Sequence, residues 1–152
     1  MKHIHIILAM LLPFAFADCY AQTGDVKTFS ILGDSYSTFE GYIPEGNACW
    51  YSTAPHGEND VTSVEQTWWH LFAKENGYEL LLNESYSGST ICNTGYDGAD
   101  YSDRAFTKRM FNVTAGDPDM IVIFGGTNDS WANAPVGELK FNGWTSSDMY
   151  SC

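Results

Sequence analysis

Lys27-Thr-Phe-Ser-Ile-Leu-Gly-Asp-Ser35 is the stretch that decides the fold. Its first part, residues 27–33, is a short apolar-rich run that stops at Gly33-Asp34-Ser35, as a buried strand does when it ends in a turn. In an open parallel sheet, chemistry gathers at the carboxyl ends of the strands. A polar turn at the end of such a strand therefore marks a candidate edge for a functional site.

Two later segments repeat this arrangement of an apolar run and a polar turn. Residues 78–83 carry three consecutive leucines, as expected of a strand buried on both faces, and lead to Ser87-Gly88-Ser89. Residues 120–124 are rich in Ile and Val and run into Gly-Gly-Thr-Asn-Asp at 125–129. We expect all three turns on one edge of the sheet, where a serine can attack a carbonyl while fixed donors meet the oxygen that gains charge.

Two helices are predicted between these strands. Ser63 opens the first, Gln66 completes a capping box and Gly77 ends it, and its apolar face comprises Val64, Trp68, Leu71 and Phe72. Asp103 is expected to cap the second, which Gly116 closes, with a stripe of Phe106, Met110 and Val113. Alternating strands and helices predict an α/β protein, a three-layer α/β/α sandwich around a flavodoxin-like parallel sheet.

The composition is that of one folded domain with an acidic surface. The chain has 152 residues, of which 44% are hydrophobic and 15% aromatic, enough for a real core. Its formal net charge is -12 and its seven Lys and Arg are scattered, so nucleic acid is an unfavourable partner. The acidic surface also disfavours anionic substrates, whereas neutral esters meet no such penalty.

Residues 1–21 have the three parts of an export signal: a basic start, an apolar run and a small-residue exit. Cleavage is expected after Ala21, which leaves residues 22–152 as one domain in the periplasm or outside the cell. The alternative is a lipoprotein that keeps an acylated Cys19, although Asp18 is a poor residue to precede such a cysteine. Past the signal, no segment is apolar for long enough to span a bilayer.

Three cysteines, Cys49, Cys92 and Cys152, follow the expected cleavage site. An odd number in an exported protein allows at most one internal bridge plus one free thiol, or a partner that the chain does not contain. The pairing to test first is Cys49 with Cys92. The alternative, that all three are reduced, stays equally open.

The polar turns resemble the sequence blocks of the SGNH hydrolases, the GDSL-like lipases and acylhydrolases. The first block of that family is a Gly-Asp-Ser turn and the third is Gly-x-Asn-Asp, which read here Gly33-Asp34-Ser35 and Gly126-Thr127-Asn128-Asp129. The resemblance implies that Ser35 is the nucleophile. Its own N–H, the N–H of Gly88 and the side-chain amide of Asn128 would then form the oxyanion hole.

The resemblance covers about residues 27–131 and includes no Asp-x-x-His block, from which the family draws its base. His56, in an aperiodic excursion over residues 36–62, and His70, in the first helix, are interpreted as ordinary loop and helix residues, since neither follows an Asp at that spacing. Two explanations stay open: the chain is a truncated part of a longer hydrolase, or it is complete and has lost catalysis. The intact turns favour the first.

The sequence thus predicts an exported carboxylic-ester hydrolase that acts on a small or carbohydrate-linked acyl ester through an acyl-enzyme. No metal or organic cofactor is implied. Trp131, three residues past Asn128, is the candidate aromatic residue to face the substrate. The alternative function is a non-catalytic carbohydrate- or surface-binding module on the same fold.

Overall fold

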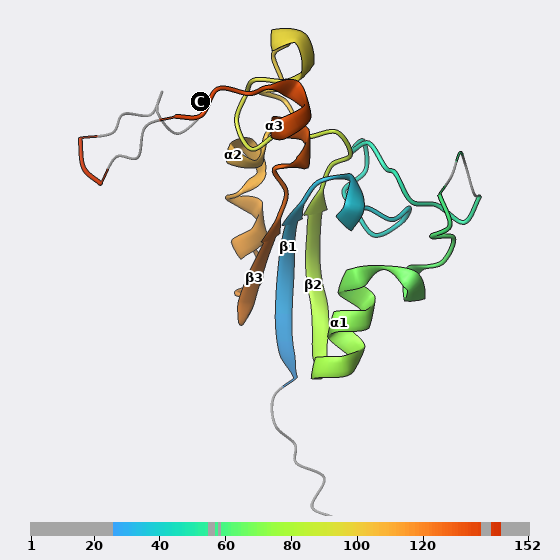
Figure 1. Ribbon diagram of the computed structural model, residues 1–152. Helices are drawn as coiled ribbons and strands as arrows, with labels where there is room; N and C mark the ends of the chain where they lie inside the picture. The colour runs from blue at the N-terminus through green and yellow to red at the C-terminus, as the bar shows by residue number, and fades with distance from the viewer. Residues whose placement is uncertain (1–25, 55–56, 58, 138–140, 144–152) are drawn as a thin grey trace, which may run out of the picture.

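The computed structural model describes residues 26–54, 57, 59–137 and 141–143. Its sheet has three parallel strands in the order β2-β1-β3: β1 is Lys27–Gly33, β2 is Tyr78–Ser85 and β3 is Met120–Phe124 (Figure 1). The predicted strands are confirmed, and β2 continues two residues further than expected. β1 hydrogen-bonds to both neighbours, so the stretch that opens the sequence argument is also the centre of the sheet.

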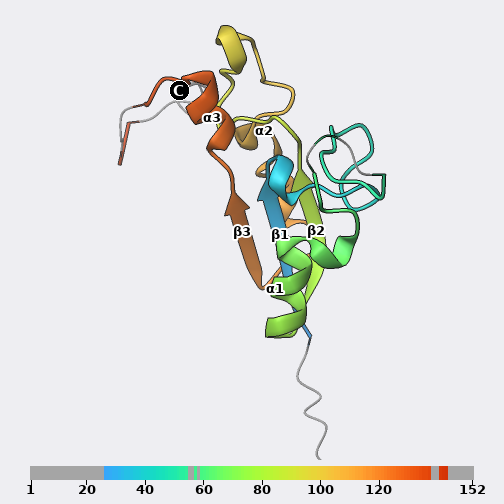
Figure 2. The same ribbon diagram turned by 45° about the vertical axis from the view of Figure 1, so that its right-hand side comes forward.

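The connections between the strands cover opposite faces of the sheet. Figure 2 shows helix α1, Trp68–Asn76, in front of the strands and helix α2, Phe106–Arg109, behind them. The chain runs from β1 to β2 on one side and then crosses to β3 on the other side of β1. The direction in which the strands are added therefore reverses between β1 and β3, and open α/β sheets form a crevice at such a point. The expected three-layer α/β/α fold with a flavodoxin-like sheet is therefore confirmed.

The first predicted helix is interrupted at Thr67. A 3-10 turn, Val64–Gln66, comes first, and Thr67 is extended before α1 begins. The Thr67 hydroxyl then caps α1 by accepting a hydrogen bond from the His70 N–H at 3.3 Å. This break turns the helix, so Trp69 is the buried residue at 2% exposure and Leu71, expected on the apolar face, is 45% exposed.

The second predicted helix is also shorter and starts later than expected. Ala105, and not Asp103, precedes α2, and a separate 3-10 turn, Asn112–Thr114, follows it. Asp103 is not a cap because its carboxylate pairs with the adjacent Arg104 at 2.9 Å. The predicted stripe is confirmed, since Phe106 and Val113 are buried with Leu32 and Met110 packs against them.

The core lies on both faces of β1, because successive side chains of a strand point to opposite faces. Phe29 and Ile31 face α1 and pack with Phe39 and Trp69. Leu32 faces α2. The prediction that the strand of the three leucines, β2, is buried on both faces is wrong, because Leu81 is exposed. Three residues of β3, Ile121, Ile123 and Phe124, are exposed as well.

Helix α3, Thr127–Ala132, directly follows β3 and completes the carboxyl end of the sheet. Within the part of the chain that the structure describes, no helix has the length and apolar character needed to cross a membrane.

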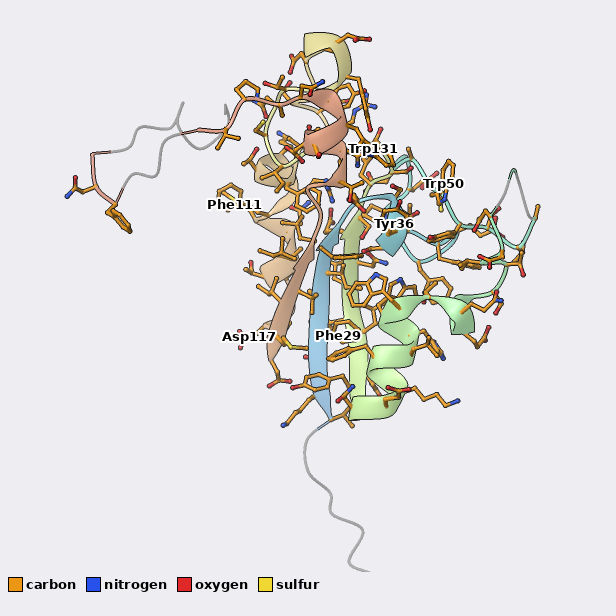
Figure 3. The ribbon with its side chains drawn as sticks, viewed as in Figure 1. Phe29, Tyr36, Trp50, Phe111, Asp117 and Trp131 are labelled. Atoms are coloured by element: carbon orange, nitrogen blue, oxygen red, sulfur yellow. The ribbon has the colours of Figure 1, made fainter. Side chains whose placement is uncertain are left out.

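We predict that Phe29→Ala lowers the free energy of unfolding by about 3–5 kcal/mol. The ring is fully buried and packs edge-on against Phe72, with centroids 5.4 Å apart, and against Tyr78 at 6.2 Å. Phe111, which Figure 3 shows on the outer side of the molecule, is 59% exposed and gives a matched control. Phe111→Ala is expected to cost less than about 1 kcal/mol in urea unfolding. Equal losses would contradict the assignment of the core.

Candidate active site

The turn after β1 presents Ser35 at the carboxyl edge of the sheet. Asp34 is buried, its carboxylate accepts a hydrogen bond from the Tyr36 N–H at 3.2 Å, and its own N–H donates to the carbonyl of Phe124 at 3.3 Å. Ser35 then begins a short 3-10 turn, Ser35–Ser37, and its carbonyl accepts from the Thr38 hydroxyl at 2.7 Å. The half-buried Ser35 is thus fixed between the ends of β1 and β3.

Residue 33 must be glycine because there is no room for a side chain beneath this turn. A Cβ at residue 33 would lie 2.5 Å from the Cβ of Ser37 and from the Oγ of Ser85. The carbonyl of Ser37 is itself held by the Asn83 amide at 2.8 Å and by the Trp69 indole N–H at 3.0 Å. The turn therefore has no room to move away from an added side chain.

Gly88 lies in a tight turn after β2. The Ser89 N–H donates to the Tyr86 carbonyl at 3.2 Å, and Gly88 has φ +80°, which a residue with a Cβ rarely adopts. The Ser87 N–H donates to the carbonyl of Ala48 at 2.8 Å, so the excursion after β1 supports this turn.

Asn128 reaches the same turn from the start of α3. Its side chain is 4% exposed, its Nδ2 donates to the Ser89 carbonyl at 2.9 Å, and its Oδ1 accepts from the Tyr96 hydroxyl at 2.8 Å. Because a carbonyl can only accept, the atom that faces Ser89 is the amide nitrogen. One amide proton is used there, and the second has no acceptor among the described residues.

Asp129 holds the next residues of the same loop. Both of its carboxylate oxygens lie 2.9 Å from the backbone nitrogen of Ile91. The structure therefore brings the blocks of Ser35, Gly88 and Asn128 to one edge, as expected. Their chemical roles remain predictions.

Arg109, which sequence reasoning misses, joins the ends of two strands beneath the site. Its guanidinium is buried and donates to the carbonyl and hydroxyl oxygens of four residues: Gly33 at 3.1 Å, Ser89 Oγ at 2.9 Å, Arg104 at 2.9 Å, and Glu84. A signal was available, because residue 109 lies three positions after Phe106 on the apolar face of the predicted helix. A basic residue on such a face needs buried partners.

The electrostatics of this edge follow from burial. Burial lowers the pKa of Arg109 to about 10, against the opposing effect of Glu84 and Asp34, so the guanidinium stays charged at neutral pH. Burial raises the pKa of Asp34, while the Tyr36 N–H and the charge of Arg109 act in the opposite direction. Arg109 and Asp34 thus partly compensate each other under the Ser35 turn.

The described histidine does not lie at this edge. His70 is in α1, with its ring 6.4 Å from that of Trp69, and it lines a cavity of about 710 Å³ with Tyr42 and the leucines of β2. That cavity includes no residue of the three turns. His56 lies outside the described residues.

The expected pairing of Cys49 with Cys92 is wrong. Cys49 is a free, exposed thiol that donates to the Tyr51 carbonyl at 3.1 Å, whereas the buried Cys92 is disulfide-bonded. The alternative of three reduced thiols is therefore wrong as well. The spacing of cysteines along a chain does not determine which of them meet in the fold.

Three polar turns gathered at the carboxyl edge of a flavodoxin-like sheet place the protein in the class of open three-layer α/β proteins, which carry their sites at that edge. More specifically, the chain belongs to the GDSL-like lipase/acylhydrolase family, whose model matches residues 27–152. The resemblance drawn from the sequence blocks is confirmed.

Two solved structures are similar to this chain. One is a crystal structure described as a "putative GDSL-like lipase" from Bacteroides ovatus ATCC 8483, which is 58% identical with a TM-score of 0.78; the match covers 84% of this chain and 61% of that one. The other, described in the same words, is from Bacteroides uniformis ATCC 8492, with 58% identity, a TM-score of 0.74 and coverage of 82% and 59%. This chain thus spans about three fifths of their length. No curated protein matches the sequence.

We predict that Arg109→Met lowers the free energy of unfolding by about 3–5 kcal/mol, because it removes a buried donor to the Gly33 and Glu84 carbonyls and leaves Glu84 and Asp34 without the compensating charge. Arg104→Met is the matched control. Arg104 pairs with the exposed Asp103 and stacks 4.6 Å over the Tyr101 ring, so its loss is expected to cost about 1 kcal/mol or less. Urea unfolding measures both, and similar losses would show that Arg109 does not organise the edge.

Proposed function

We propose that this chain is the nucleophile-bearing part of an exported serine carboxylic-ester hydrolase. The observation that carries the proposal is a set of three hydrogen-bond donors at one edge. Within the described part of the chain, the N–H of Ser35, the N–H of Gly88 and the second amide proton of Asn128 donate to nothing. Buried or half-buried donors without acceptors suit an oxygen that gains negative charge only during the reaction.

In the proposed reaction, Ser35 Oγ attacks the ester carbonyl and its proton passes to a base. The carbonyl oxygen becomes an oxyanion that accepts from the three donors. Collapse of this tetrahedral species expels the alcohol, which takes up the proton, and leaves an acyl group on Ser35. Water then attacks the acyl-enzyme with the same base and releases the carboxylic acid. By the resemblance to the family, the base in this reaction is the histidine of an Asp-x-x-His block.

For the substrate we propose a small or carbohydrate-linked acyl ester. Trp131, in α3, is 63% exposed, and Tyr36 directly follows the nucleophile and is also exposed. Figure 3 shows both at the end of the sheet to which the strands point. Flat aromatic faces of this kind can pack against the apolar side of a sugar ring. Export rests on the signal-like sequence of residues 1–21, which lie outside the described residues.

We predict that a fluorophosphonate probe labels the full-length gene product and that Ser35→Ala abolishes the labelling, because phosphonylation requires an activated serine. Ser102→Ala, which removes an exposed hydroxyl from a loop before α2, is the matched control and should label normally. Labelling is measured by in-gel fluorescence. A full-length protein that folds but does not label would refute the esterase and favour the binding module.

A further inference from the structure

We infer that Tyr96 is a positioning residue for the oxyanion hole, one that orients and polarises the amide of Asn128. This inference rests on the proposed function, since it matters only if Asn128 stabilises an oxyanion. Tyr96 belongs to a short 3-10 turn, Tyr96–Gly98, in the loop between β2 and α2, and it lies outside the three turns that carry the family resemblance.

The direction of the hydrogen bond is fixed by chemistry. The Asn128 Oδ1 can only accept, so the Tyr96 hydroxyl at 2.8 Å donates to it. On the other side, Nδ2 donates to the Ser89 carbonyl at 2.9 Å. A flipped amide would place Oδ1 against that carbonyl oxygen and would leave Tyr96 as an acceptor. The two contacts together therefore select one amide orientation, in which the free N–H lies on the side that neither partner occupies.

The same contact strengthens the amide as a donor. A hydrogen bond to the oxygen of an amide draws electron density from its nitrogen, and linked hydrogen bonds in a low-dielectric site reinforce one another by roughly 10–30% per bond. Asn128 is buried, so this effect is not screened by water as it would be on the surface. Tyr96 thus acts on the reacting oxygen through Asn128 and does not touch it.

The loop that carries Tyr96 is closed and stiff. Its ends are joined by the hydrogen bond from the Tyr101 N–H to the Asn93 carbonyl at 2.7 Å. The Tyr96 and Tyr101 rings pack edge to face with centroids 6.2 Å apart, and a Cβ on Gly95 would lie 2.4 Å from the Tyr101 ring. These contacts hold the Tyr96 hydroxyl in position against the Asn128 amide.

The phenol also keeps its proton. Burial raises the pKa of Tyr96, and the neighbouring Tyr101, Asp34 and Asp129 raise it further. The hydroxyl is therefore a neutral donor at physiological pH, as the contact with Oδ1 requires.

The test is a double-mutant cycle on the full-length protein with p-nitrophenyl acetate as the probe, and with rates expressed per active site titrated by a fluorophosphonate. Tyr96→Phe is expected to lower kcat about 10-fold with little change in KM, less than the 10²- to 10³-fold loss on removing a whole donor with Asn128→Ala. In the Asn128→Ala background, Tyr96→Phe should have no further effect. Tyr101→Phe, which removes a hydroxyl from the same loop that makes no hydrogen bond to the described residues, is the control and should retain full kcat.

The outcomes separate this inference from the proposed function. The role of Tyr96 would be overturned if Tyr96→Phe left kcat unchanged or altered only KM. It would also be overturned if Tyr96→Phe lowered kcat by the same factor in the Asn128→Ala background. A wild-type protein with no Ser35-dependent hydrolysis would instead overturn the esterase. Because rates are given per titrated site, partial unfolding of a variant does not imitate a catalytic effect.

Discussion

The buried guanidinium of Arg109 is the constraint on which the rest of the structure depends. Parallel strands that end at one edge leave carbonyl groups without partners once the chain turns away. Arg109 approaches that edge from α2 and donates to the carbonyls of Gly33, the last residue of β1, and of Glu84, the next-to-last residue of β2. The same nitrogen that contacts Gly33 also contacts Ser89 Oγ. One rigid fork of donors thereby fixes the turn before Ser35 and the turn around Gly88 relative to each other.

The loop after β2 is consequently held from two sides. On one side, Arg109 donates a hydrogen bond to the Ser89 hydroxyl. On the other side, two residues of α3 bind the backbone of the loop: Asn128 donates to the Ser89 carbonyl, and Asp129 accepts from the Ile91 N–H. Oxyanion donors are effective only when they need not reorganise during the reaction. A glycine turn is inherently adaptable, so its rigidity must come from such neighbours. Here the Asn-Asp pair, two consecutive residues of α3, supplies this rigidity.

The sequence could predict features that depend on neighbouring residues, but few of the features that depend on residues far apart in the chain. Apolar runs determine the strands, so their positions agree within two residues. The break at Thr67 and the absence of a cap at Asp103 could not be predicted, because a short polar side chain can hydrogen-bond to any of several nearby groups. Tyr96 and Arg109 escape sequence reasoning since their partners Asn128 and Glu84 lie 32 and 25 residues away. The pairing state of Cys49 is equally a property of the fold.

The acidity of the chain gives Arg109 a second role under the proposed mechanism. A protein with a formal net charge of -12 would repel the oxyanion that its own nucleophile creates, and Asp34 and Asp129 both lie at the same edge. Neutral donors stabilise the oxyanion but do not offset those carboxylates. Arg109 does, because burial leaves its charge little screened by water and it stays protonated at neutral pH. Under the proposed mechanism, the residue that closes the sheet edge therefore also supplies a fixed positive charge near the donors.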